Sequence, residues 1–432
     1  MLSIDIRRVS KPTSRVWVVL AFVFPSTALP QPDAQQQKIQ ELLQRIQDVE
    51  SHDANSEELI DPFTTLGRLY RDGGDAIRST AATRRAVEIL RFNEGLHTLD
   101  QAPLIRSLIG DAEAIGDPGS AWDLEQELLT LASRHPDDPR TARILRETAD
   151  RRVAVLDRYI GGEIPPEIEL GCYYQDLPVY PDAIQNCHSG NRNTVKFRLL
   201  YEAQTLYSQA VNVLVGSEHS AGDEVQTLLE DLARTSYRYE NAARLFGSHR
   251  YENAARRPSG AETAVSDAAA LGRRSLAFLL EWQASHAQAW SDRMETLVEI
   301  ADWDLLHSNS GKADEAALKE YMDVYELLVA QGAGESIDQL FSPEIPIVLP
   351  TFVPNPLVSD REQGANGYID VAFEIDTYGK SRHVRILNAT TDPAPATKKR
   401  LVELISRSLF RPRVAEGRFA ESAPVVVRYY FE

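Results

Sequence analysis

Apolar residues recur at intervals of three and four along most of the chain, from about residue 56 to residue 332. This spacing places apolar side chains on one face of an α-helix, as in Leu66, Leu69 and Tyr70. Short breakers such as Gly73-Gly74 separate these segments. The pattern predicts helical hairpins at spacings of about 35 residues, each of which buries its apolar face against the next hairpin. An irregular all-helical domain is the alternative.

One of these segments carries a family motif. The stretch Leu66-Gly67-Arg68-Leu69-Tyr70 resembles the start of a tetratricopeptide repeat, and Ala86-Val87-Glu88-Ile89-Leu90 resembles its second half. The resemblance implies that Gly67 lets the paired helix approach closely. Weaker pairs span residues 105–133 and 297–330. We expect a mostly α protein with tetratricopeptide-like helical hairpins over residues 36–159 and 194–340.

Residues 160–193 interrupt the helices, because their glycines and prolines disfavour a long helix. Both cysteines of the chain, Cys172 and Cys187, lie in this insert. In an exported protein, two close cysteines most often form a disulfide, so we expect a loop pinned by this bond. A Cys/His metal site is the alternative, but the spacing of a zinc site is missing, and we expect no metal.

The end of the chain changes its hydrophobic period. A proline-rich segment at residues 341–365 predicts an extended, semi-rigid linker. Within residues 366–432, strict alternation over 369–375 and 425–431 predicts half-buried strands, and 384–386 belongs to a return strand after a turn at Gly379. Residues 396–409 read as a helix with an apolar face of Leu401, Leu404, Ile405 and Leu409. The expected order is strand, strand, helix, strand, a small α+β domain.

This order and two motifs resemble the C-terminal domain of TonB proteins. The motifs are Gly367-Tyr-Ile-Asp-Val-Ala-Phe-Glu-Ile-Asp-Thr-Tyr-Gly379 in the first hairpin and Phe410-Arg411-Pro412 after the helix. The resemblance implies a ββαβ protein-binding module that pairs a peptide of an outer-membrane receptor against its last strand by β-augmentation. The matching edge would be residues 425–431, with Val426, Arg428 and Tyr430 directed outward for partner contacts.

The first residues indicate export. Arg7, Arg8, Lys11 and Arg15 precede an apolar run that begins at Val16, and small residues follow it up to Ala28. This order is typical of a signal peptide over residues 1–28. An uncleaved anchor is the alternative, although a membrane-spanning helix needs about 20 apolar residues. TonB energy transducers keep such an anchor with a Ser and a His inside it, and the apolar run here contains no His.

The net charge and the absence of catalytic sequence motifs reduce the range of possible functions. The chain carries 46 basic and 64 acidic residues, a net charge of −18, which disfavours nucleic acid as a partner. No HExxH, GxSxG, SxxK or phosphate-loop pattern is present, so we expect no catalytic residues and no cofactor. The sequence predicts a non-catalytic protein of a Gram-negative periplasm that contacts other envelope proteins. The alternative is a TonB-type energy transducer anchored in the inner membrane.

Overall fold

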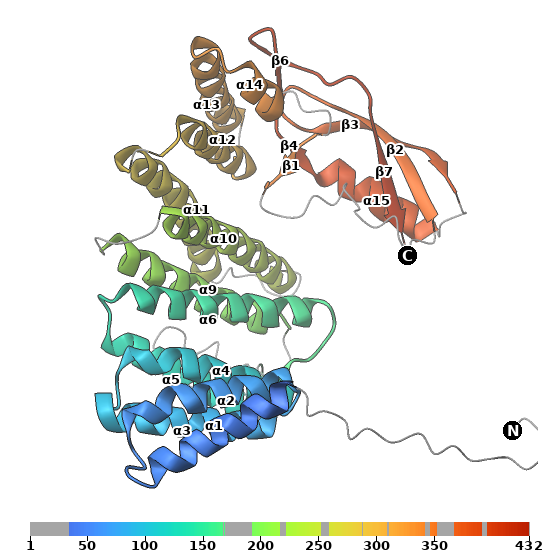
Figure 1. Cartoon of the computed structure of the whole chain (residues 1–432). Helices are drawn as coiled ribbons and strands as arrows, with labels where there is room; N and C mark the ends of the chain where they lie inside the picture. Colours follow the sequence, from blue (N-terminus) through green and yellow to red (C-terminus); the bar gives the residue numbers. More distant parts are fainter. Residues whose placement is uncertain are drawn as a thin grey trace, which may run out of the picture.

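The computed structural model describes residues 34–166, 168, 192–216, 222–251, 259–286, 288–308, 311–341, 346–351, 367–390 and 395–431. Most of these residues are helical, and a small β-sheet region closes the chain (Figure 1). The leader at 1–28 and both cysteines, Cys172 and Cys187, lie outside the described residues.

The helical region consists of helices that follow one another along the molecule from α1 to α14 (Figure 1). Their bounds are α1 Ala34–Glu50, α2 Ile60–Asp72, α3 Ala76–Glu94, α4 Ala102–Ala114, α5 Pro118–Arg134, α6 Pro139–Ile160, α9 Arg192–Val215, α10 Gly222–Tyr251, α11 Ser259–Ser285, α12 Trp290–Leu306, α13 Gly311–Ala330 and α14 Gly334–Phe341. Two short 3₁₀ turns, η1 Glu57–Leu59 and η2 Leu99–Gln101, precede α2 and α4.

The turns of the hairpins α2–α3 and α4–α5 have the same residue types and the same hydrogen-bond pattern. Gly74 and Gly116 adopt positive φ angles of 78° and 71°, which end the preceding helices at no steric cost. The next residue in each case is an N-cap. Asp75 accepts a hydrogen bond from the amide of Arg78 at 2.9 Å, and Asp117 accepts one from Ser120 at 3.0 Å. The Gly-Asp pair therefore reverses the chain direction in both α2–α3 and α4–α5.

Packing inside the first hairpin depends on Gly67. A Cβ at this position in α2 would lie 2.5 Å from the side-chain oxygen of Thr83 in α3. The missing side chain allows the two helices to approach closely, as expected from the sequence. Ala86, Ile89 and Leu90 on the facing side of α3 are buried.

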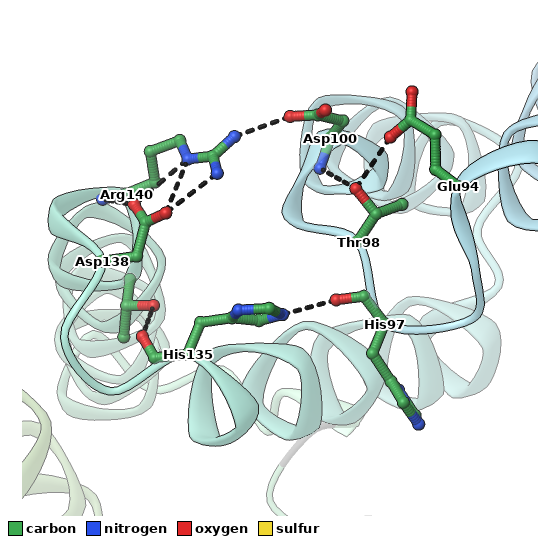
Figure 2. A network of polar contacts seen from close by, with 8 residues as sticks. Glu94, His97, Thr98, Asp100, His135, Asp138 and Arg140 are labelled. Carbon is green, nitrogen blue, oxygen red and sulfur yellow. Dashed lines mark hydrogen bonds and ion pairs between the residues drawn. The ribbon is translucent and has the colours of Figure 1, made fainter.

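Polar contacts tie successive hairpins together at a regular interval. Arg71 with Asp111, Arg106 with Glu147, and Arg151 with Glu113 are separated by 40, 41 and 38 positions. Figure 2 shows the same relation between the first turn of α6 and the 3₁₀ turn η2, where Arg140 donates to Asp100 at 2.6 Å. These contacts join a residue of one hairpin to a residue of the next, as between α4 and α6.

The C-terminal region contains a three-stranded antiparallel sheet in the order β3-β2-β7. Its strands are β2 Gly367–Ile375, β3 Ser381–Ala389 and β7 Val425–Phe431, and α15 spans Pro395–Arg407. Side chains from one face of β2 form a core with Leu401 and Ile405 of α15. The alternating pattern of β2 and β7 thus defines a buried face and an outward face, as predicted.

The structure differs from the prediction at the end of α15. The helix ends at Arg407, and Leu409 belongs to strand β4 (Leu409–Phe410) instead of the apolar helix face. Leu404 is 40% exposed. Two further strands, β5 Arg413–Ala415 and β6 Arg418–Ala420, form a hairpin before β7. The predicted order of strand, strand, helix, strand therefore lacks the short strands β4, β5 and β6.

The expectation of an unpacked linker is wrong for residues 346–351. Strand β1 (Val348–Leu349) pairs with β4, and both of its side chains are buried. Leu349 packs in one cluster with Tyr321 and Phe341 of the helical region, and Val348 packs against the sheet core. Residues 352–366 lie outside the described residues. The described piece of this segment joins the helical region to the C-terminal domain.

Candidate interaction sites of the C-terminal domain

Strand β7 lies at an edge of the sheet, since in the described part of the chain it pairs only with β2. The antiparallel register runs from Gly367 opposite Phe431 to Phe373 opposite Val425. In such a strand, alternate backbone N–H and C=O groups point away from the paired neighbour. The free side of β7 therefore offers a row of hydrogen-bonding groups, which a further strand can use.

The three outward residues expected from the sequence do lie on one face, but two of them already have partners. Arg428 donates to the Asp370 carboxylate at 2.8 Å, and its guanidinium lies 3.8 Å from the centre of the Tyr368 ring. The hydrogen bond with Asp370 raises the pKa of Arg428. Tyr430 stacks edge-on against Tyr368 at 6.3 Å between ring centres.

Val426, in contrast, is 58% exposed. Of the three outward side chains, it is the one that offers apolar surface next to the free backbone edge. The cross-strand cluster of Tyr368, Asp370, Arg428 and Tyr430 holds β7 in register with β2, since opposite charges and aromatic pairs stabilise facing positions on two strands. This cluster therefore has a structural role in addition to any contact with a partner.

The two sequence motifs of this domain meet in the structure. Gly379 has a φ of 77°, and a Cβ there would overlap the carbonyl of Phe410. The amide of Phe410 donates to the carbonyl oxygen of Gly379 at 2.8 Å. The Phe410 ring is fully buried and lies 5.3 Å from that of Phe373. The motif glycine therefore serves the close approach of the two segments.

Asp376 organises the turn that precedes Gly379. Its carboxylate accepts hydrogen bonds from the amides of Tyr378 and Lys380, both at 2.9 Å, and from Arg382. Burial alone would raise the pKa of Asp376, but these hydrogen bonds outweigh it, and the pKa is lowered. The charged form of Asp376 thus stabilises the hairpin between β2 and β3.

Arg411, the next motif residue, connects the C-terminal domain to the helical region. Its guanidinium donates to both oxygens of Asp302 in α12, at 3.0 Å and 2.5 Å. Tyr321 of α13 donates to the same carboxylate at 2.6 Å. The side chains of Arg411 and Asp302 are only 6% and 5% exposed. Burial alone would lower the pKa of Arg411, but the charge of Asp302 and the hydrogen bonds raise it.

Glu299 lies one helical turn before Asp302 on α12. Burial raises the pKa of Glu299 to about 8, and the carboxylates of Glu230, Asp302 and Glu295 add to this effect, whereas Arg411 opposes it. The junction, formed by α12, α13 and the segment around Arg411, therefore contains more carboxylates than Arg411 neutralises. Sequence reasoning missed this site, because Asp302 and Arg411 are 109 positions apart.

A second site lies in the helical region. A cavity of about 840 Å³ opens between α5, α6 and α9, with Leu129, Leu145 and Leu206 among its lining residues. At one end, the buried Arg152 pairs with Glu125 and Glu202, each at 2.9 Å, and stacks over Trp122. Burial raises the pKa of Glu125, and Arg152 opposes this effect. No sequence motif marks this cavity.

The described residues contain neither a candidate metal site nor a candidate membrane span. There, no three His, Cys, Asp or Glu side chains gather as a candidate metal site. In the same residues, every helix is too short or too polar to cross a bilayer. No protein-family model and no curated protein matches the chain.

Proposed function

We propose that the protein is an exported, non-catalytic component of a Gram-negative cell envelope that binds other proteins through its helical region and its C-terminal domain. One observation carries the proposal. Within the described residues, strand β7 is an edge strand with an exposed apolar side chain, Val426, beside backbone groups that no other described strand pairs. Such an edge favours the addition of a partner strand.

The resemblance to TonB C-terminal domains supports the choice of this edge. The motif residues Gly379 and Phe410 contact each other, and Arg411 fixes the same segment to α12. A peptide of an outer-membrane receptor is the partner that the resemblance implies for β7. The side-chain cluster around Arg428 keeps β7 aligned with β2, so the free edge is already formed before a partner arrives.

The helical region supplies the second binding surface in this proposal. Two features support a tetratricopeptide-like array. Helices α2 and α3 approach closely at Gly67, and ion pairs between residues 38 to 41 positions apart join successive hairpins. The cavity between α5, α6 and α9 has apolar walls and the amide side chains of Gln126 and Gln209 at its border. This combination suits a protein segment, because amides bond to a peptide backbone while the walls bury its apolar side chains.

Photo-crosslinking in cells tests the role of β7. A photoreactive amino acid at Val426 should capture an envelope protein, whereas the same residue at Leu387 should not. Leu387 is a matched control, because it lies on β3 at the opposite edge of the sheet and is 51% exposed. Equal capture at both positions, or no capture at Val426, would contradict the proposed use of β7.

Two further measurements test export. The intact mass of the purified protein should correspond to cleavage after Ala28, and thiol counting should find Cys172 and Cys187 oxidised. A retained leader together with crosslinks to an inner-membrane motor would favour an energy transducer instead. Reduced cysteines in a protein that remains in the cytosol would exclude the envelope function.

A further inference from the structure

A cavity of about 440 Å³ lies where β7 begins. Its apolar lining includes Leu340 of α14, Ile347 of the segment that leads to β1, Ile375 of β2, and Val425 and Val426 of β7. Cavities of roughly 300–1,000 Å³ are usual for ligand sites in proteins. This one has room for a few amino-acid side chains.

The position of the cavity relates it to the free edge of β7. Val425 and Val426 are the first two residues of the strand, and both line the cavity. A strand that pairs with the free edge of β7 reaches the cavity at the end that faces Val425. The residues of the partner at that end leave the backbone ladder and contact the cavity walls.

Two basic side chains line the described part of the cavity. Arg411 and Arg413 both line it, and none of its described lining residues is acidic. Arg411 is neutralised by Asp302 at 2.5 Å. Arg413 lies on β5, is exposed, and has no carboxylate partner among the residues that the structure describes. One guanidinium group is therefore available beside an apolar surface.

We infer that this cavity binds a carboxylate at the end of the peptide strand that adds to β7, with Arg413 as its ion-pair partner. A strand antiparallel to β7 would bring its C-terminal carboxylate to this place, whereas a parallel strand would bring an acidic side chain near its N-terminus. In both cases an adjacent apolar side chain contacts Ile347 and Val426. The inference rests on the proposed binding of a peptide at β7, and it adds the chemistry that selects the peptide.

The cavity lies between the junction and the edge strand β7, because residues of both line it. Leu340 of the helical region and Arg411 of the C-terminal domain both line the cavity, and Arg411 donates to the carbonyl oxygen of Leu340 at 3.3 Å. A peptide in the cavity contacts both the C-terminal domain and the helical region. The binding site is thus complete only when the two parts are docked.

Fluorescence anisotropy with the mature chain and labelled ten-residue peptides of alternating Val and Thr tests the inference. Three peptides differ only at their ends: one has a free C-terminal carboxylate, one an amidated C-terminus, and one an amidated C-terminus with Asp at the second position. We expect one of the two acidic peptides to bind about tenfold more tightly than the uncharged peptide, as for a charge-assisted hydrogen bond. The identity of that peptide reports the strand direction.

The variant Arg413→Gln should remove this preference and leave the binding of the uncharged peptide unchanged. Arg418→Gln is the matched control, because Arg418 is an exposed arginine on β6 of the same hairpin that does not line the cavity. Equal affinity of all three peptides, or equal effects of the two variants, would overturn the role of the cavity while leaving β7 as a binding edge. The absence of binding by every peptide would overturn the edge proposal as well.

Discussion

The helical region and its junction with the C-terminal domain use polar contacts in two different ways. Between hairpins, ion pairs recur at intervals of 38 to 41 positions, and pairs such as Arg140 with Asp100 are 59% and 55% exposed. At the junction, one ion pair joins Arg411 to Asp302 across 109 positions and is almost completely buried. The first kind is repeated and at least one side chain of each pair is partly exposed, since even the buried Asp111 pairs with an Arg71 that is 32% exposed. In the second kind both side chains are shielded from water, as they also are where Arg152 pairs with Glu125 inside the helical region.

This difference predicts how strongly a substitution in each region affects the stability of the fold. In a chain of stacked hairpins each unit contacts mainly its neighbours, so the loss of one exposed tie has a small and local effect. The buried pair has no substitute, and removing one partner leaves a charge without water or a counterion. The junction should therefore be the more sensitive of the two regions.

The largest effect is expected for Arg411→Met. The variant leaves the Asp302 carboxylate buried with Tyr321 as its one remaining donor among the described residues, so unfolding should cost about 3–5 kcal/mol less than in the wild type. Urea denaturation followed by tryptophan fluorescence, to which Trp303 beside Asp302 contributes, measures this change. The double variant Arg411→Met with Asp302→Leu should recover most of the loss. If it were as unstable as the single variant, the pair would not be the cause.

A steric test compares two helical glycines. A Cβ at Gly272 of α11 would overlap the ring of Trp303 in α12, whereas a Cβ at Gly110 of α4 would have open space around it. Gly272→Ala should destabilise the protein by about 1–3 kcal/mol through overpacking, and Gly110→Ala should stabilise it by about 0.5–1 kcal/mol. Thermal denaturation of both variants checks the sign. A stabilising Gly272→Ala would contradict the close contact of α11 and α12.

The junction should also depend on pH. Because the pKa of Glu299 is raised to about 8 in the folded protein, the folded state binds more protons than the unfolded state between about pH 4.5 and 8. Stability should therefore fall as pH rises through this range, by about 1–3 kcal/mol, since part of the carboxyl is solvated.

Denaturant unfolding of the wild type and of Glu299→Gln at pH values across this range measures that dependence. The variant should be less sensitive to pH and more stable at the alkaline end. The same slope in both proteins would assign the pH dependence to other groups.

The smallest effect is expected for Arg140→Ala, which removes the tie in Figure 2 between Arg140 and Asp100. An exposed pair contributes at most about 1 kcal/mol. The variant should shift the midpoint of thermal unfolding slightly at low salt and still less at high salt, because salt screens exposed charges. A loss as large as that of Arg411→Met would contradict the contrast between the two regions.

Several elements could be predicted from the sequence because their signals are local. The period of three and four marked α2 to α5 and α12 to α13, and strict alternation marked β2 and β7 with their buried faces. The turn at Gly379 was visible as well. The end of α15 was not, because Leu409 fits an apolar helix face and a strand equally well, and only its pairing with Leu349 decides between them.

The candidate sites were less accessible to sequence reasoning. Val426 was identified correctly as an outward residue, but Arg428 and Tyr430 face the same way and already bind Asp370 and Tyr368. A strand pattern shows which face a side chain occupies, and it does not show which cross-strand neighbour it meets. That neighbour depends on the register between β2 and β7, which are more than fifty residues apart.

By itself, the sequence determined the kinds and the order of the longer elements, since helical and strand periodicity, Gly-Asp turns and motif glycines act over a few residues, but it did not reveal the short strands β1, β4, β5 and β6. The tertiary structure alone decided that Arg411 meets Asp302, that the proline-rich segment packs at Val348 and Leu349, and that cavities form at β7 and between α5 and α9. The physical reason is that burial and ion pairing depend on which distant segments are brought together. That choice is made by the whole core and not by any one stretch of the chain.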